Sequence, residues 1–339
     1  MSQANINTSS LPQLVDLVNR SFIASQGNQL DNVMLKSGLI RKETIPVGTG
    51  AVRRFAESIA RTSYSGEGVE GAPATQAIFQ YGYEKDLIVD KHELAISITR
   101  DMRVYGKDQD IIRQLTDLGG AGYREIDLAL SHRFAFAWST SYTNSRGFTK
   151  DLTCWDGLAL ISTVHTLTGS SDTYSNQIPN NQQFSKWAYV AAKKIAVENT
   201  RNNIGEKMVL DYNTILTTDD EDTIIAVKEL SNATADITSS NAGTYNVYKG
   251  LKHIIAPRIA TTANGWVDTT KRKYWFLCSS DLQAIIYGEV EAPYVTTPRD
   301  GNNGEDASTQ NWNFYTYARW GTAVASPRGI IWSKGDGTA

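Results

Sequence analysis

The spacing of hydrophobic positions predicts a short helix near the start of the chain. Between residues 11 and 23, apolar side chains recur every three or four residues after a Ser-Leu-Pro start, namely Leu11, Leu14, Val15, Val18 and Phe22. The next apolar positions follow a more strand-like pattern, and they are Leu35, Leu39, Ile40, Ile45 and Val47. The first fifty residues therefore predict an amphipathic helix followed by extended chain.

Residues 52–102 predict an extended hairpin. Polar and apolar residues nearly alternate along RFAESIART, and the Gly-rich segment GEGVEGAPATQ (66–76) follows. The return segment predicts a strand, with alternation clearest from Leu94 to Ile98. The tip has too few apolar residues to bury itself. An arm of this kind needs another surface to lie on, usually another subunit.

Residues 107–141 predict one long helix. Hydrophobic and small residues recur at three- and four-residue steps from Ile111 to Trp138. At 1.5 Å per residue such a helix spans roughly 50 Å, much longer than the average helix. The Gly119-Gly120 pair costs about 1 kcal/mol per glycine relative to alanine, which predicts a kink there.

From residue 184 onward the pattern alternates between helix and strand, after a loop-like region at 142–183. It predicts helices over 184–199 and 218–230, and strands over 208–217, 251–259 and 274–278. Thr218 and Glu221 fit a capping box at the second helix. A further helix is expected from Ser279 or Ser280, and long aromatic-rich antiparallel strands over 312–333.

Composition narrows the classes of function. The 339 residues suggest two domains or one large interwoven domain, and 41% hydrophobic residues are enough for a core. With 33 Lys+Arg against 36 Asp+Glu, the formal charge of −3 gives no bulk attraction to phosphate, unlike a dedicated nucleic-acid coating protein. No stretch approaches the ~20 apolar residues that cross a bilayer, and no signal peptide is visible. We expect a soluble protein made in the cytoplasm.

Candidate catalytic, cofactor and metal sites are few, and each has a simpler explanation. Residues 66–71 match GxGxxG, but Pro73 follows and Glu67 and Glu70 would repel a pyrophosphate. The acidic run at 219–222 suits a helix start better than a metal ion. The four histidines lack metal-ligand spacing. We therefore expect no catalytic residue, no cofactor and no metal.

The two cysteines, Cys154 and Cys278, cannot form a disulfide framework. Cys154 and His165 could be imagined as a nucleophile and its base, but a lone Cys beside a Trp in a Thr-rich loop is more often structural. We expect replacement of Cys154 or His165 to alter stability slightly and to remove no activity.

Charged residues on the predicted hairpin are candidates for contacts between subunits. They are Arg53, Arg54, Arg61, Glu67 and Glu70. They are expected to pair with a neighbouring copy and set its register, because charges at the rim of an interface mostly determine specificity and approach. The alternative is a solvated hairpin surface.

The order of elements, with three local stretches, resembles the major capsid protein of tailed bacteriophages, which has the HK97-like fold. The three stretches are DGLALISTVHTLTGSSDTYSN (156–176), EKMVLDYNTILTTDDEDTIIAVKEL (206–230) and YWFLCSSDLQAIIYG (274–288). The second departs from the usual form, since Asp211 and Tyr212 stand where a proline is common. The resemblance covers nearly the whole chain and rests more on architecture than on invariant residues.

The resemblance implies an α+β fold with five parts. They are an N-terminal arm (1–51), an E-loop hairpin (52–102), a peripheral domain with the spine helix and following loop (103–183), an α/β axial domain (184–311) and the return strands of the peripheral domain (312–339). It also implies a non-enzymatic shell protein of the virion. Hexamers and pentamers, assembled in the bacterial host cytoplasm, would close an icosahedral head around double-stranded DNA that is contacted non-specifically, with no membrane involved.

The resemblance further implies a portal and a possible decoration or cementing protein as partners. Scaffolding, if used, is expected from a separate protein, because Met1 is only ten residues from the first helix; the alternative is a chain already trimmed to its mature form. Some relatives weld subunits through a lysine on the E-loop, whereas every position from Glu43 to Glu84 here is another residue. We therefore expect a shell held by non-covalent contacts.

Three alternatives remain open. An encapsulin-like compartment shell would share the fold and enclose enzymes instead of DNA. An α/β enzyme with an unrecognised site belongs to a different class. A tail or decoration protein would suit the aromatic and Thr-rich strands but not the long helix.

Overall fold

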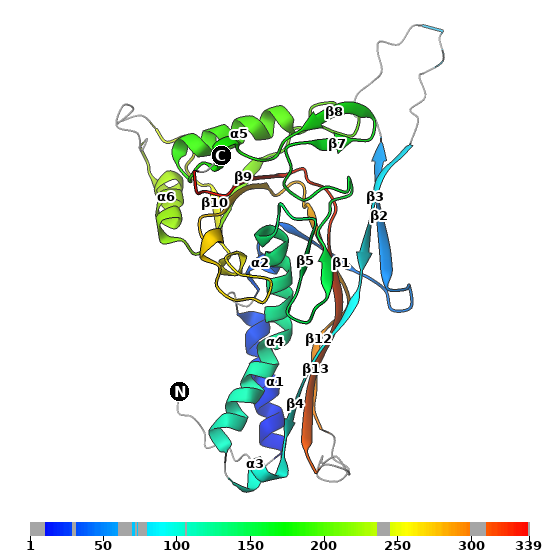
Figure 1. Ribbon diagram of the computed structural model, residues 1–339, viewed down its shortest axis with the longest axis vertical. Helices are drawn as coiled ribbons and strands as arrows, with labels where there is room; N and C mark the ends of the chain where they lie inside the picture. Colours follow the sequence, from blue (N-terminus) through cyan, green and yellow to red (C-terminus); the bar gives the residue numbers. More distant parts are fainter. Residues whose placement is uncertain are drawn as a thin grey trace.

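The computed structural model describes residues 11–28, 32–59, 70–71, 73, 80–105, 107–235, 245–298 and 310–337. The described chain has a narrow part, containing helices α1 (Leu11–Gly27) and α4 (Asp108–Ala135), and a broad part, containing helices α5 (Lys186–Asn199) and α6 (Glu221–Asn232) (Figure 1). The amphipathic helix predicted near residue 11 is therefore confirmed, as are the helices predicted from 184 and 218. No helix of the described residues is long and apolar enough to cross a membrane.

A four-stranded sheet runs along the narrow part and continues into the broad part. Its order is β1 (Ile40–Thr44), β12 (Ile285–Thr296), β13 (Trp312–Val324) and β4 (Asp90–Ile98); β1 is parallel to β12 and the other pairs are antiparallel. In the narrow part α1 and α4 pack on one face of this sheet, over Trp312 and Phe314 of β13. This packing explains why alternate residues of β13 are buried.

Helix α4 is the expected spine, but it has 28 residues and ends at Ala135 instead of near 141. It continues through Gly119 and Gly120, where we expected a kink. A Cβ at Gly119 would lie 1.9 Å from Oγ of Ser21 and 2.8 Å from the backbone nitrogen of Phe22. Gly119 therefore allows α1 to approach α4 closely, which sequence spacing alone did not show.

A second four-stranded sheet forms the centre of the broad part. Its order is β10 (Lys252–Ile255), β9 (Tyr212–Thr217), β11 (Trp275–Ser279) and β14 (Ile330–Ser333). Helices α5 and α6 pack against it through a core that includes Tyr189, Val227 and Trp275. The N-cap of α6 is Asp220, whose carboxylate accepts a hydrogen bond from the Thr223 backbone, so the capping box predicted at Thr218 is wrong.

The helix expected from Ser279 or Ser280 is also wrong, because residues 285–296 form strand β12. The run Ile285-Ile286-Tyr287 is buried between β1 and β13, and a short, continuous apolar run does not distinguish a buried strand from a helix. The loop-like region contains two short hairpins. They are β5 (Ser141–Thr143) with β6 (Thr149–Asp151), and β7 (His165–Leu167) with β8 (Ser170–Tyr174).

The predicted hairpin is present, but its two described strands cover less of the chain than the segment 52–102 that was predicted. Strands β2 (Val52–Ile59) and β3 (Gln80–Ile88) pair with each other in a separate two-stranded sheet, which we call the arm. The return strand breaks at Val89, and β4 joins the first sheet instead of extending the arm. Short helices α2 (Val33–Lys36) and α3 (Arg100–Val104) complete the described helices of more than three residues.

Candidate assembly surface

The arm lies along one edge of the broad part (Figure 1). Alternation along its strands gives it an inner and an outer face: Glu57, Lys85 and Leu87 are buried, whereas Arg54 and Glu84 are exposed. The inner face is held by the body of the protein. The outer face is open to solvent in the isolated chain.

Arg54 forms its ion pairs inside its own arm. Its Nε lies 2.8 Å from Oδ1 of Asp86, which is directly opposite in the ladder, and its NH1 lies 2.9 Å from Oε2 of Glu84. The hydrogen bonds from Arg54 lower the pKa of the Asp86 carboxyl. Arg54 therefore links β2 to β3, a contact that alternation could have suggested only if the register had been known.

The other predicted contact residues have different surroundings. Arg53 is exposed; its guanidinium lies 5.7 Å from the Phe55 ring centroid, and within the described part of the chain it has no ion-pair partner. Glu70 is exposed. Arg61 and Glu67 lie outside the described residues. Arg53 and Glu70 are thus placed where a neighbouring molecule could reach them, and the three described residues of the predicted set do not form one cluster.

The root of the arm contains a buried ion pair that sequence reasoning missed. NH1 of Arg328, in the turn between β13 and β14, donates to Oε1 of Glu57 at 2.5 Å. The side chain of Arg328 is 5% exposed and that of Glu57 is 6% exposed. Burial raises the pKa of the Glu57 carboxyl, and the Arg328 guanidinium opposes that shift. The guanidinium also lies 5.3 Å from the Trp155 ring centroid. The two residues are 271 positions apart, so no local pattern could have paired them.

A second anchor lies on strand β3. Nζ of Lys85 donates to Oδ2 of Asp151 at 2.5 Å and to Oγ1 of Thr153 at 2.7 Å. Two positions earlier, the hydroxyl of Tyr83 lies 2.8 Å from Oγ1 of Thr166. These contacts fix the inner face of the arm against the short hairpins of the body. Lys85 is therefore a structural cation of the arm root.

Two glycines in the first sheet make room for the arm root. Gly288 of β12 and Gly321 of β13 are opposite each other in the ladder. A Cβ at Gly321 would lie 1.9 Å from the carbonyl oxygen of Ile88, and a Cβ at Gly288 would lie 2.8 Å from Cδ2 of Leu87. The backbone where β3 ends thus passes directly over β13. The position of the arm is set by this close approach as well as by the ion pairs.

Cys154 and His165, the candidate nucleophile and base, have surroundings that do not suit these roles. Burial raises the pKa of the Cys154 thiol well above its usual value, which opposes formation of a thiolate. The His165 ring is fully buried, with Nδ1 2.7 Å from Oδ2 of Asp156 and Nε2 3.3 Å from the Leu160 carbonyl oxygen. Both ring nitrogens are therefore used in structural contacts. Asp156 is buried as well, so we revise the expectation that loss of His165 alters stability only slightly.

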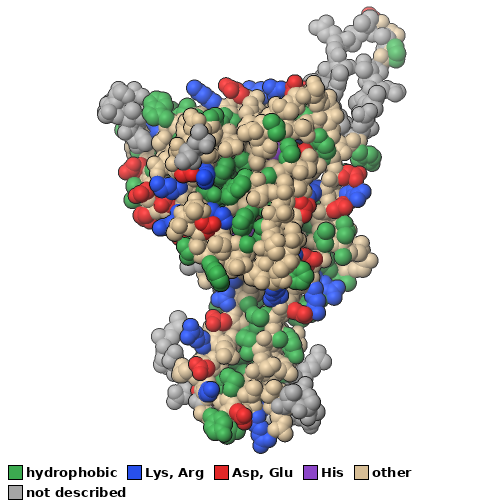
Figure 2. Space-filling model, in the orientation of Figure 1, with side chains coloured by type: hydrophobic (Ala, Val, Ile, Leu, Met, Phe, Trp, Pro, Cys, Tyr) green, Lys and Arg blue, Asp and Glu red, His purple; other side chains and the backbone are tan. Residues whose placement is uncertain are grey.

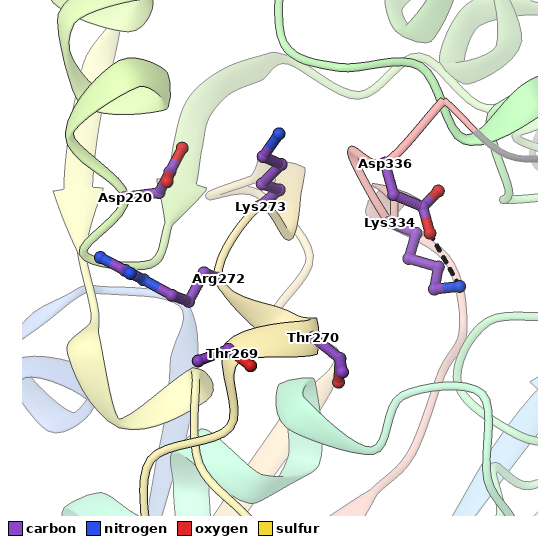
Figure 3. Close-up of a pocket in the computed structure, with 7 residues that line it drawn as sticks. All are labelled: Asp220, Thr269, Thr270, Arg272, Lys273, Lys334 and Asp336. Atoms are coloured by element: carbon purple, nitrogen blue, oxygen red, sulfur yellow. Dashed lines mark ion pairs between the residues drawn. The ribbon is translucent and has the colours of Figure 1, made fainter.

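A groove of about 540 Å³ in the broad part is lined by Asp220, Thr269, Thr270, Arg272, Lys273, Lys334 and Asp336 (Figure 3). Lys334 is paired with Asp336 at 2.8 Å, and Asp220 caps α6. Arg272 and Lys273 point in different directions and do not face a common point (Figure 3). Within the described ranges, no group of three His, Cys, Asp or Glu side chains could hold a metal ion. These side chains do not form a reaction centre.

Large apolar side chains are exposed on the arm. Val52 and Ile88 pair across the ladder and are 53% and 57% exposed, and Tyr81 is 84% exposed. Elsewhere on the visible face, hydrophobic, basic and acidic side chains are interspersed (Figure 2). Exposed apolar residues on a two-stranded extension that has little core of its own are typical of a surface that another chain covers.

No protein-family model matches the chain, and no curated protein matches it. Solved structures of phage capsids do match. The capsid of Ralstonia phage GP4 has a TM-score of 0.54 at 12% identity, covering 87% of this chain and 86% of that chain. The mature capsid of bacteriophage PhiM1 has a TM-score of 0.52 at 10% identity, covering 89% of this chain and 86% of that chain. The chain has the HK97-like capsid fold.

A third capsid, from cyanophage P-SCSP1u, has a TM-score of 0.51 at 14% identity and covers 87% of this chain and 85% of that chain. The α+β capsid fold expected from the sequence is therefore confirmed. At these sequence identities the similarity shows the fold alone and does not assign roles to individual residues. The arm-root contacts described above are observations on this chain alone.

Proposed function

We propose that this protein is the major capsid protein of a tailed bacteriophage, a structural subunit that self-assembles into hexamers and pentamers of an icosahedral head. The capsid fold over most of the chain supports the proposal, together with the fact that three phage capsids of similar length share it. Those neighbours favour a phage head over an encapsulin-like compartment. The head encloses double-stranded DNA, and the protein is part of the virion.

The observation that carries the proposal is the arm. It is fixed at its root by Glu57–Arg328 and by Lys85–Asp151, yet its outer face has exposed apolar side chains and no cover from its own chain among the described residues. A rigid root with an open outer face is what a subunit needs to reach a neighbour in a defined direction. The division into N-terminal arm, E-loop hairpin, peripheral domain, axial domain and return strands given above belongs to this proposal.

The proposed partners are further copies of the chain, a separate scaffolding protein, a portal and a decoration or cementing protein. Assembly takes place in the cytoplasm of the bacterial host. The proposed role is a structural one, in line with the phage capsids that share the fold.

Deletion of residues 65–76 tests the proposal. The purified full-length protein is expected to form closed particles or regular capsomers in negative-stain microscopy, whereas the deletion variant is expected to stay folded and soluble without closing shells. Replacement of 65–76 by a Gly/Ser segment of equal length is the matched control, because it keeps the reach of the hairpin and removes its side chains.

Two results would contradict the proposal. A wild-type protein that stays monomeric or dimeric at all concentrations cannot be a shell subunit. Normal shells from the deletion variant would show that the arm is only a surface loop. Circular dichroism of each variant establishes that a failure to assemble is not a failure to fold.

A further inference from the structure

Strand β4 forms one edge of the first sheet. It pairs with β13 at all nine positions from Asp90 to Ile98 without a register shift, and no strand of the described residues pairs on its other side. Natural proteins protect such an edge with a proline, a bulge, charged side chains or a very short strand, because its free N–H and C=O groups can pair with another chain. Of these protections β4 has only charged side chains. By contrast β1, at the opposite edge of the sheet, has five residues.

Side chains of β4 are exposed on both faces of the sheet. On the face away from α4, the side chains of Lys91 and Glu93 are 51% and 59% exposed and form an ion pair with each other at 2.6 Å. On the face toward α4, Leu94 is 41% exposed and borders, with His92, a cavity of about 80 Å³ between α4, β4 and β13. An exposed leucine beside a cavity at an unpaired edge is typical of a surface that another strand covers.

The charge pattern of this edge is complementary to itself. Residues directly opposite each other in an antiparallel pair have side chains on the same face, with Cβ atoms about 4.5–5.5 Å apart. If two copies of β4 pair antiparallel about His92, Lys91 of each copy lies opposite Glu93 of the other. The two central His92 rings are neutral at pH 7, because burial lowers the pKa of His92 to about 4. Leu94 of each copy then lies diagonally across from His92 of the other, where it covers the cavity.

The geometry of such a pair also suits a closed shell. The twofold axis that relates the two strands is perpendicular to the sheet, so α4 lies on the same side of the sheet in both copies. A shell requires this arrangement, because every subunit presents the same face to the interior. The contact is isologous, since both copies use the same surface.

We propose that β4 pairs antiparallel with β4 of a second copy across a twofold axis, joining two four-stranded sheets into one of eight strands. This inference rests on the proposed function and adds to it a contact between copies in neighbouring capsomers. Residues 90–94 of the two strands overlap over about 17 Å. A contact this small is weak by itself, so it forms in the shell, where each copy makes further contacts.

The test exchanges charges between chains. Lys91→Glu and Glu93→Lys each remove the ion pair within the chain and each place like charges opposite one another across the axis. Either variant alone is expected to bind about five-fold more weakly for each opposed pair, and to give few closed shells in negative-stain microscopy. An equimolar mixture of the two variants again places unlike charges opposite each other. It is expected to restore shells, although the ion pair within each chain is still absent.

The matched control exchanges charges at an exposed ion pair of α1. Asp16 and Arg20 lie 2.7 Å apart, and their side chains are 56% and 78% exposed. Asp16→Lys and Arg20→Glu are each expected to form shells as the wild type does, so loss of an exposed ion pair alone does not prevent assembly.

A disulfide tests the register directly. Chains with Lys91→Cys are assembled together with chains that have Glu93→Cys, and after mild oxidation the shells are expected to contain covalent dimers of the two chain types. The native Cys154 and Cys278 are buried and do not compete. Ser97→Cys in place of Glu93→Cys is the control, because Ser97 does not lie opposite Lys91 in this register.

Three results would overturn the inference and leave the proposed function intact. They are normal shells from Lys91→Glu or Glu93→Lys alone, a mixture that assembles no better than its two components, and shells without the mixed covalent dimer. A wild-type chain that never assembles would overturn the proposed function itself, and the β4 contact with it.

Discussion

Gly321→Ala should displace the arm, because the added methyl group would occupy the space of the Ile88 carbonyl oxygen. The Cβ would lie 1.9 Å from that oxygen, 2.8 Å from its carbon and 3.2 Å from Cα of Val89. Ordinary contacts of this type are about 3.3 Å, so the β3–β4 connection or β13 must move by about 1.4 Å. The blocking atoms are backbone, and no change of side-chain rotamer can relieve the clash.

The cost follows from this geometry. Overpacking of a filled site costs about 1–3 kcal/mol, and a backbone clash belongs at the upper end. With an unfolding entropy of about 2.1 cal/mol/K per residue, 3 kcal/mol corresponds to a melting temperature about 4 °C lower for this chain. Assembly should be affected more than stability, since the arm leaves the body at the displaced segment.

Differential scanning fluorimetry and negative-stain microscopy measure the two effects. Gly288→Ala is the graded comparison, because its Cβ would meet the flexible end of Leu87, and Gly27→Ala is the control, because no heavy atom lies within 4 Å. The expected order of damage is Gly321, Gly288, Gly27. If Gly321→Ala melts and assembles like the wild type, the close approach does not position the arm and the reasoning is refuted.

Three further outcomes follow from the structure. Shells boiled in detergent should run as one band near 37.4 kDa, since the Lys85 ammonium is held by Asp151; a ladder of multimers would contradict non-covalent assembly. The free energy of unfolding should fall from pH 6.5 to 4, because burial lowers the pKa of His92 to about 4 and the unfolded chain then binds more protons than the folded one. His92→Phe keeps an aromatic ring stacked on Trp320 and should flatten this pH dependence in denaturant titrations. A pH dependence equal to that of the wild type would contradict the role of His92. His165→Ala should destabilise by about 3 kcal/mol, because Oδ2 of the buried Asp156 carboxylate loses its partner while Oδ1 keeps the Leu158 backbone N–H; a melting temperature equal to wild type would exclude this.

Local sequence determined the helices and the aromatic strand. The three- and four-residue spacing of α1, α4, α5 and α6 and the alternation of β13 are properties of neighbouring residues, so they could be predicted before any contact was known. The glycine-rich segment likewise predicted a hairpin. Errors came where neighbours are ambiguous, as in the buried run that forms β12 instead of a helix.

The tertiary structure alone decided how the arm is held. Glu57 meets Arg328 across 271 positions, Gly321 meets the Ile88 backbone from another strand, and the return strand breaks at Val89 because β4 pairs with β13. Side-chain type indicates which face of an element is buried but not which distant residue lies opposite. Pairing of that kind depends on the whole set of strand registers, which exists only once the chain has folded.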